Sequence, residues 1–186
     1  MAAGSPAAAY ACPPPQPRLA QYGDEELTRS RTGRLFRRLG QKRWFAWLGS
    51  RFVWPLERAL WLRYGRGINP RDLPELLLVT QGRRTGRLRA VPVLYLEDDG
   101  HLVIVASNWG NKRHPAWSEN LLANPTVEVR LRGDTRRFQA RLLEGDEKQR
   151  LWPRLLEIWP AWSSYQERTD RDFRMFLLTE ALTGSS

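Results

Sequence analysis

The chain has 186 residues, 41% of them hydrophobic, and a formal net charge of +10, which suits one domain with a buried core and an appendage. Its single cysteine, Cys12, cannot form a disulfide within the chain, so a reducing compartment, by default the cytoplasm, is expected. No apolar run approaches the ~18 residues of a membrane span, and the first residues lack a secretory signal, so the chain is not expected to cross a bilayer.

The positive charge is concentrated in one segment. Residues 28–71 contain twelve Lys and Arg and one acid, Glu57, which leaves the rest of the chain close to neutral. Residues 1–27 have no apolar periodicity and are predicted to be a disordered leader. We therefore expect that leader, a basic amphipathic helical segment over 28–70, and a β-rich domain over 71–186.

The basic segment mixes arginine with Leu, Phe and Trp at helical spacing, which predicts two helices, the second opened by Pro55. Such helices can pack on the domain, bind an anionic membrane surface or bind nucleic acid. We expect packing plus peripheral membrane contact through residues 28–66, at the inner face of the membrane. Nucleic acid is disfavoured as a partner because no recognised binding module accompanies the charge.

After Asn69-Pro70 the pattern changes to short β-branched and aliphatic runs separated by Gly and Asp turns, which predicts strands. Six strands with few helices between them indicate a mainly β (α+β) fold, an antiparallel barrel or sandwich whose first three strands form a meander. The expected elements are strands at 75–81, 88–97 and 101–107, a helix between Pro115 and Asn124-Pro125, two strands within 126–145 around Gly133-Asp134, a helix within 146–160, a helical turn, and a last strand near 173–179.

The turn between the first two predicted strands, GRRTGRLR at residues 82–89, carries four arginines. Glycines beside basic residues let N–H groups and guanidinium groups converge on an anion, and arginine binds phosphate or carboxylate through two parallel hydrogen bonds. The turn is therefore either an anion-binding loop or a solvated hairpin tip. It is not a Walker or dinucleotide-binding loop, because no helix follows the glycines.

A second basic loop lies in ASNWGNKRHPAWSENL, residues 106–121. The third predicted strand ends there at Ser107, and the helix that starts at Pro115 would add free N–H groups to the positive charge. Strands 1 and 3 of a meander end on the same side, so this loop is expected to approach the arginine turn. His101 and His114 have no partner at metal-ligand spacing, and no serine lies in a nucleophile elbow, which disfavours a metalloenzyme or a hydrolase.

A third motif, WPAWSSYQERTDR at residues 159–171, spaces Trp159, Trp162 and Tyr165 three apart. This spacing lines one face of a helical turn and could form the wall of an apolar pocket. Ordinary core packing also explains it, and the spacing alone favours packing.

The segments GRRTGRLRAVPVLY, ASNWGNKRHPAWSENLLANPTVEV and WPAWSSYQERTDR, in this order and spacing, resemble the deazaflavin-dependent nitroreductase family, oxidoreductases that use coenzyme F-420. Over residues 72–180 the resemblance implies a six-stranded split β-barrel related to flavin-mononucleotide-binding proteins, with reduced deazaflavin in a groove and FMN as the less favoured cofactor. It also implies that basic loops bind the charged cofactor tail. The cofactor-binding residues expected on this basis are Arg83, Arg84, Thr85, Arg87, Arg89, Ser107, Asn108, Trp109, Lys112, Arg113 and Trp117.

The resemblance further implies roles in the reaction. Ser107 would lie beside the deazaflavin ring, Tyr165 would donate or deliver a proton, and Trp159, Trp162 and Tyr165 would contact the substrate. Many relatives have Lys-Gly after the serine where this chain has Asn108-Trp109. The expected function is hydride transfer from reduced F-420 to a quinone-like, nitro or other conjugated acceptor. The alternative is a non-catalytic split-barrel carrier of flavin, haem or fatty acid, and either a monomer or a homodimer is compatible with the sequence.

Overall fold

The computed structural model describes residues 73–131 and 133–181, together with Leu56, Ala59, Leu60 and Arg63. The predicted leader, residues 1–27, and nearly all of the basic segment 28–70 lie outside the described residues. The four described residues between 56 and 63 are helical, as the pattern after Pro55 predicts.

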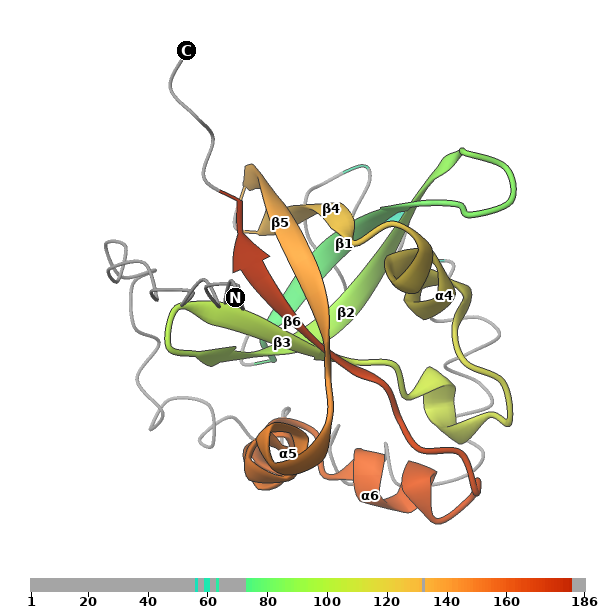
Figure 1. The fold of residues 1–186 in the computed structure, drawn as a ribbon, viewed down its shortest axis with the longest axis vertical. Coiled ribbons are helices and arrows are strands. Elements are labelled where there is room, and N and C mark those ends of the chain that lie inside the picture. Colours follow the sequence, from blue (N-terminus) through green and yellow to red (C-terminus); the bar gives the residue numbers. More distant parts are fainter. Residues whose placement is uncertain (1–55, 57–58, 61–62, 64–72, 132, 182–186) are drawn as a thin grey trace, which may run out of the picture.

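Six antiparallel strands form a closed barrel in the order β1-β2-β3-β6-β5-β4 (Figure 1). β1 pairs with both β2 and β4, which closes the sheet on itself. The predicted barrel and its β1-β2-β3 meander are confirmed, and the sandwich alternative is wrong. The strands are β1 Glu75–Gln81, β2 Leu88–Asp98, β3 His101–Val105, β4 Thr126–Leu131, β5 Asp134–Leu143 and β6 Met175–Glu180.

β3 is shorter than the sequence predicts. It ends at Val105, and Ser107 has right-handed helical backbone angles, φ −71° and ψ −32°, at the start of the 3-10 helix η3 Asn108–Gly110. The polar run after Val105 therefore forms a turn and does not extend the strand.

The barrel interior is apolar, because alternate residues of each strand face inward. On β3, Leu102 and Ile104 join the interior cluster, whereas Val103 and Val105 face outward. The helix α4 Ala116–Ala123 adds Trp117 and Leu121 to the interior cluster. Its bounds match the prediction, with Pro115 and Asn124 as the flanking residues.

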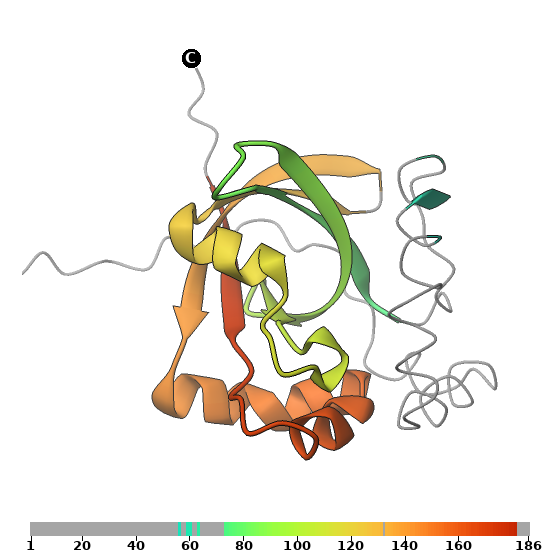
Figure 2. The ribbon, with the colours of Figure 1, turned by 90° about the vertical axis from the view of Figure 1, so that its right-hand side faces the viewer.

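Two helices cover the outward faces of β3 and β6 (Figure 2): α5 Gly145–Ile158 and α6 Ala161–Gln166. α5 buries Leu151, Leu155 and Ile158 at the i, i+4, i+7 spacing of one helix face. The arrangement leaves α4 and η3 together on another side of the barrel (Figure 2).

Candidate functional site

The arginine turn, residues 82–89, is closed by its own backbone. The N–H of Gly82 donates to the carbonyl of Arg87 at 2.9 Å, and the N–H of Gly86 donates to the carbonyl of Gly82 at 2.7 Å. Gly86 has φ +66°, a conformation that glycine adopts without steric cost. The side chains of the residues predicted to bind the cofactor here are exposed, namely Arg83, Arg84, Thr85, Arg87 and Arg89.

The backbone of this turn is attached to α4 by a buried side chain. Asn120, 5% exposed, accepts the N–H of Arg83 at 3.1 Å and donates to the hydroxyl of Thr80 at 3.1 Å. Asn124 donates to the side chain of Gln81 at 3.0 Å. The turn is therefore held in place while its arginine side chains remain in solvent.

The second predicted loop, residues 106–114, which we call the serine loop, has an unusual backbone. Asn108, Trp109 and Gly110 all have positive φ, at 47°, 57° and 75°, and such angles are uncommon for residues other than glycine. A Cβ on Gly110 would lie 2.9 Å from the carbonyl oxygen of Tyr165. The loop therefore packs on α6 so closely that only glycine fits at this position.

Arg171, which is not among the residues predicted from the sequence, also holds the serine loop in place. Its guanidinium group donates to the carbonyls of Ala106, Ser107 and Asn111 at 3.0, 2.6 and 3.0 Å. The third motif ends on this arginine, but nothing in the local sequence indicates that it reaches a loop more than fifty residues earlier.

The two loops lie on one side of the barrel with α4 between them, as Figures 1 and 2 both show. Glu119 of α4 lies 3.9 Å from Arg83 of the arginine turn and accepts a hydrogen bond at 2.6 Å from Arg174, the residue before β6. The hydrogen bond from Arg174, with the charges of Arg174 and Arg83, holds the pKa of Glu119 below its usual value despite some desolvation. The first turn of α4 thus already contains a carboxylate.

Most cations of the described chain have a partner within the fold. Arg136, Arg141, Lys148 and Arg150, for example, each form an ion pair. Apart from Arg137, the described Lys and Arg side chains without a hydrogen bond, ion pair or ring contact all lie on the two loops. They are Arg84, Arg87, Arg89, Lys112 and Arg113. Uncompensated positive charge gathered in this way fits a polyanionic ligand.

The predicted aromatic residues are buried in the described structure. Trp159, Trp162 and Tyr165 are 5%, 4% and 1% exposed and belong to the cluster beneath α5 and α6. Burial raises the pKa of Tyr165 to about 12, although a hydrogen bond with Trp159 and the charge of Arg168 act in the opposite direction. Their burial agrees with the packing interpretation, and their contact with a substrate stays a prediction.

Two further predicted aromatic residues take different positions. The half-buried Trp109 lies beside Tyr165, with ring centroids 6.2 Å apart. Trp117 is 9% exposed and packs on Phe176 in the barrel interior, with centroids 6.0 Å apart. Trp109 therefore lies between the serine loop and α6, whereas Trp117 faces the core.

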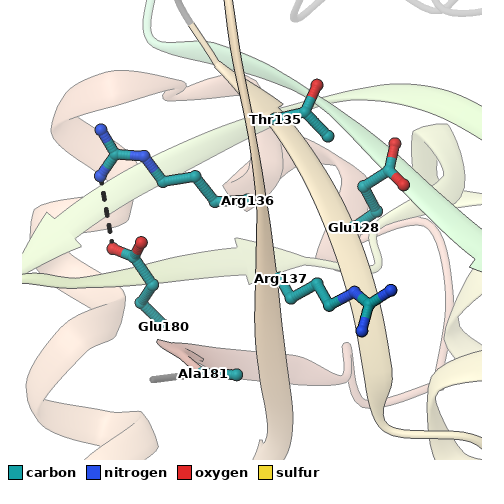
Figure 3. A pocket seen from close by; sticks show the side chains of 6 residues that line it. All are labelled: Glu128, Thr135, Arg136, Arg137, Glu180 and Ala181. Carbon is teal, nitrogen blue, oxygen red and sulfur yellow. Dashed lines mark hydrogen bonds and ion pairs between the residues drawn. The ribbon is translucent and has the colours of Figure 1, made fainter. Parts of the chain in front are cut away.

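A pocket of about 330 Å³ opens elsewhere on the barrel (Figure 3), near the last residues of β6, whereas the serine loop adjoins the first ones. It is lined by Glu128, Thr135, Arg136, Arg137, Glu180 and Ala181. Arg136 pairs with Glu180 at 3.4 Å, and the charges of the lining cancel. The pocket therefore carries no charge preference for an anion.

Two features are absent from the described residues, a metal site and a membrane-spanning helix. No group of three or more His, Cys, Asp or Glu side chains there could hold a metal ion. In the same part of the chain, no helix has the length and apolar character needed to cross a membrane.

Comparison with known proteins decides the family. The family profile described as F420H(2)-dependent quinone reductase matches residues 56–180, more than half of the chain. The chain belongs to this family. The resemblance drawn from the three sequence motifs is thereby confirmed.

Individual members of the F420H(2)-dependent quinone reductase family agree with the match. One Mycobacterium tuberculosis protein of that name is 32% identical over 117 residues, covering 63% of this chain and 98% of the relative. A second from the same species is 34% identical over 109 residues, covering 57% and 73%.

Two solved structures share the fold. An F420-H2 dependent reductase is 36% identical and covers 57% of this chain and 94% of its own, with a TM-score of 0.53. Another, described as a domain-swapped dimer, is 31% identical and covers 73% and 97%, with a TM-score of 0.55.

Proposed function

We propose that this chain transfers a hydride from reduced coenzyme F-420 to a quinone or a similar conjugated acceptor. The observation that carries the proposal concerns the two loops on one side of the barrel (Figure 1) in a member of this family: they hold five Lys and Arg side chains that have no partner among the described residues. A polyanionic cofactor needs such charge, and the fold itself does not use it.

The cofactor tail would be bound chiefly by the unpartnered side chains Arg84, Arg87, Arg89, Lys112 and Arg113. Arg83 and Thr85 lie on the same turn, and the weak 3.9 Å contact of Arg83 with Glu119 leaves it able to turn toward a ligand. Reduced deazaflavin, when bound, supplies the hydride. The protein's task is to bind and orient both reactants and to exclude water.

Ser107 is the residue proposed to stabilise the reduced acceptor. Its hydroxyl has no partner among the described residues, and its carbonyl is held by Arg171 at 2.6 Å. The hydroxyl can therefore donate a hydrogen bond to an oxygen atom that gains negative charge during reduction. Asn108 and Trp109 follow directly on the same turn and would adjoin the cofactor.

Tyr165 is proposed as the proton donor, and removal of its hydroxyl group tests this role. With a pKa raised to about 12 by burial, its phenol holds the proton firmly at neutral pH. Tyr165→Phe retains the ring and removes the proton. A loss in kcat of about 100-fold or more would support proton delivery, whereas an unchanged kcat would leave Tyr165 as packing beside Trp109.

The proposed function is tested by turnover. Purified protein is mixed with reduced F-420 and menadione, and the visible absorbance of the oxidised deazaflavin is followed as it returns. Oxidation faster than in the protein-free control is expected. Tight binding of F-420 without oxidation would favour the carrier alternative, and a titration that shows binding of FMN but not of F-420 would overturn the cofactor assignment.

We also propose peripheral contact with the inner face of the membrane through residues 28–66, where a lipid-soluble acceptor would be reached. The local charge and the tryptophans of that segment support the proposal. Deletion of residues 28–66 should abolish co-sedimentation with anionic vesicles. A homodimer is proposed from the relative described as a domain-swapped dimer, and light scattering would distinguish it from a monomer.

A further inference from the structure

Arg171 has a fourth contact with the serine loop. Besides the three carbonyls, its Nη1 lies 3.2 Å from Nδ1 of His114. A guanidinium group only donates hydrogen bonds, so Nδ1 must accept and His114 must be neutral, with its proton on Nε2. One side chain thus contacts Ala106, Ser107, Asn111 and His114, which span the whole loop.

Among the residues that the structure describes, no carboxylate pairs with Arg171. The adjacent Asp172 accepts both of its hydrogen bonds from Lys148, at 2.5 Å, and Arg171 instead stacks over the ring of Phe173 at 4.7 Å. Burial lowers the pKa of Arg171, and the charge of Arg174 lowers it further. Partial burial of a charge without an acid partner is costly, and here carbonyl dipoles of the serine loop provide the compensation.

The backbone of Arg171 is attached to α6. Gln166, the last residue of α6, donates from Nε2 to the carbonyl of Arg171 at 2.8 Å and lies 3.4 Å from the carbonyl of Thr169. A continuous set of hydrogen bonds therefore runs from α6 through Arg171 to Ser107. The contact of Gly110 with Tyr165 joins the same two elements a second time.

We propose that Arg171 is a positioning residue, which holds the serine loop against α6 and thereby fixes the place of Ser107. This inference rests on the proposed function in so far as Ser107 contributes to the reaction. The mechanical part, that Arg171 orders residues 106–114, stands on the hydrogen bonds alone.

The same geometry makes the contact between Arg171 and His114 of the serine loop sensitive to acid. The charged groups around His114 are Arg171, Arg174, Glu119 and Asp172. Burial lowers the pKa of His114 below its ordinary 6.5, and the charges of Arg174 and Arg171 lower it further, against the two acids. Protonation would replace the acceptor at Nδ1 with a donor beside two arginines. The fourth contact is therefore present above that pKa and is lost as the pH falls through it.

The first experiment compares Arg171→Gln, Arg171→Lys and wild type by hydrogen–deuterium exchange of peptides covering residues 106–114. Exchange should quicken at least about tenfold in Arg171→Gln, with partial rescue in Arg171→Lys, which retains the charge but not the fork of donors. The value of kcat/KM should fall about 10- to 100-fold in Arg171→Gln. The matched control is Arg141→Gln, which removes an exposed ion pair with Glu147 and should leave loop exchange unchanged.

The second experiment uses His114→Asn, whose side-chain oxygen branches from the same carbon as Nδ1 and can accept from Arg171 but cannot be protonated. After correction for intrinsic exchange, the wild-type loop should exchange faster as the pH falls through the lowered pKa of His114, and His114→Asn should not. This variant tests the contact between Arg171 and the serine loop even if Arg171→Gln does not fold.

Unchanged loop exchange in Arg171→Gln would overturn the positioning role of Arg171, and a pH profile in His114→Asn identical to that of wild type would overturn its acid sensitivity. Neither hydrogen–deuterium exchange measurement requires turnover. Absence of quinone reduction by the wild type would therefore sink the proposed function and leave the ordering of the loop to be judged separately.

Discussion

The cationic and aromatic parts of the candidate site are built in opposite ways. On the arginine turn and the serine loop, charged side chains such as Arg84 and Lys112 are exposed and have no partner in the described fold. Trp162 and Tyr165, on α6, are 4% and 1% exposed and pack beneath the barrel. The cationic side chains therefore contribute little to stability and are available to a ligand, whereas the aromatic ones stabilise the fold first.

The largest effect on stability is expected for Trp162→Ala, in the aromatic part of the site. Removal of a buried indole from the cluster beneath α5 and α6 should lower the free energy of unfolding by about 3–5 kcal/mol. Urea denaturation measures it, with Leu122→Ala as the control, because Leu122 is 47% exposed and its loss should cost under about 1 kcal/mol. Equal losses of unfolding free energy in the two variants would contradict the conclusion that the buried aromatic side chains stabilise the fold. Trp162→Phe, which retains a ring, is the variant for testing acceptor use.

Gly110→Ala should have the next largest effect. Gly110 and Gly100 have nearly the same φ, +75° and +77°, but a Cβ on Gly110 would lie 2.9 Å from the carbonyl oxygen of Tyr165, whereas one on Gly100 would meet nothing within 4 Å. Gly100→Ala should cost only the conformational strain, about 1–2 kcal/mol. Gly110→Ala should cost about 1–3 kcal/mol more. Thermal unfolding of the pair measures the difference, and no difference would mean that η3 and α6 are not in contact.

Arg84→Gln should change affinity without changing stability. Loss of one charge-assisted contact should weaken F-420 binding by about 1–3 kcal/mol in calorimetry, while the urea midpoint stays at the wild-type value. Arg137→Gln is the matched control, since Arg137 is the other described cation without a side-chain partner and lies outside the two loops. If both variants bind the cofactor like wild type, the tail is bound elsewhere.

Glu119→Gln should have the smallest effect. Its carboxylate lies between the two loops, so its removal should strengthen binding of a polyanion by less than about 1 kcal/mol. Since the pKa of Glu119 is below 4.5 in the folded chain, the carboxylate stabilises the fold above that value and loses this contribution as the pH falls through the folded pKa. The variant should show a shallower loss of stability in acid. Weaker binding of the polyanion by Glu119→Gln than by wild type would contradict the expected direction of this effect.

The barrel and the arginine turn were predictable because their signals are local. Gly82 and Gly86 lie between two apolar runs, a pattern that indicates a turn. Pro115 and Asn124 delimit α4 without help from the rest of the chain. The meander follows from the short connections, since antiparallel strands need no crossover. These features depend on neighbours in sequence, and a single chain contains that information.

The role of Arg171 was not predictable in the same way. Its acceptors are backbone carbonyls of a loop in which Asn108 and Trp109 have positive φ, and nothing in the sequence indicates that angle for a tryptophan. The burial of Tyr165 likewise depends on how α6 meets β3 and β6. The three-residue aromatic spacing could indicate a pocket wall or packing, and only the tertiary fold separates the two.

The attachment of the arginine turn to Asn120 affects the thermodynamics of binding. A ligand that reaches this turn meets a main chain that is already ordered, so the entropy lost on association falls on the arginine side chains, about 0.5–1.5 kcal/mol for each one immobilised. A loop without that attachment would also lose backbone freedom, at roughly 1–2 kcal/mol per residue. The heat capacity and entropy of association should therefore resemble those of a rigid receptor, and removal of the amide in Asn120→Ala should make association entropically less favourable even though no group that touches the ligand has changed.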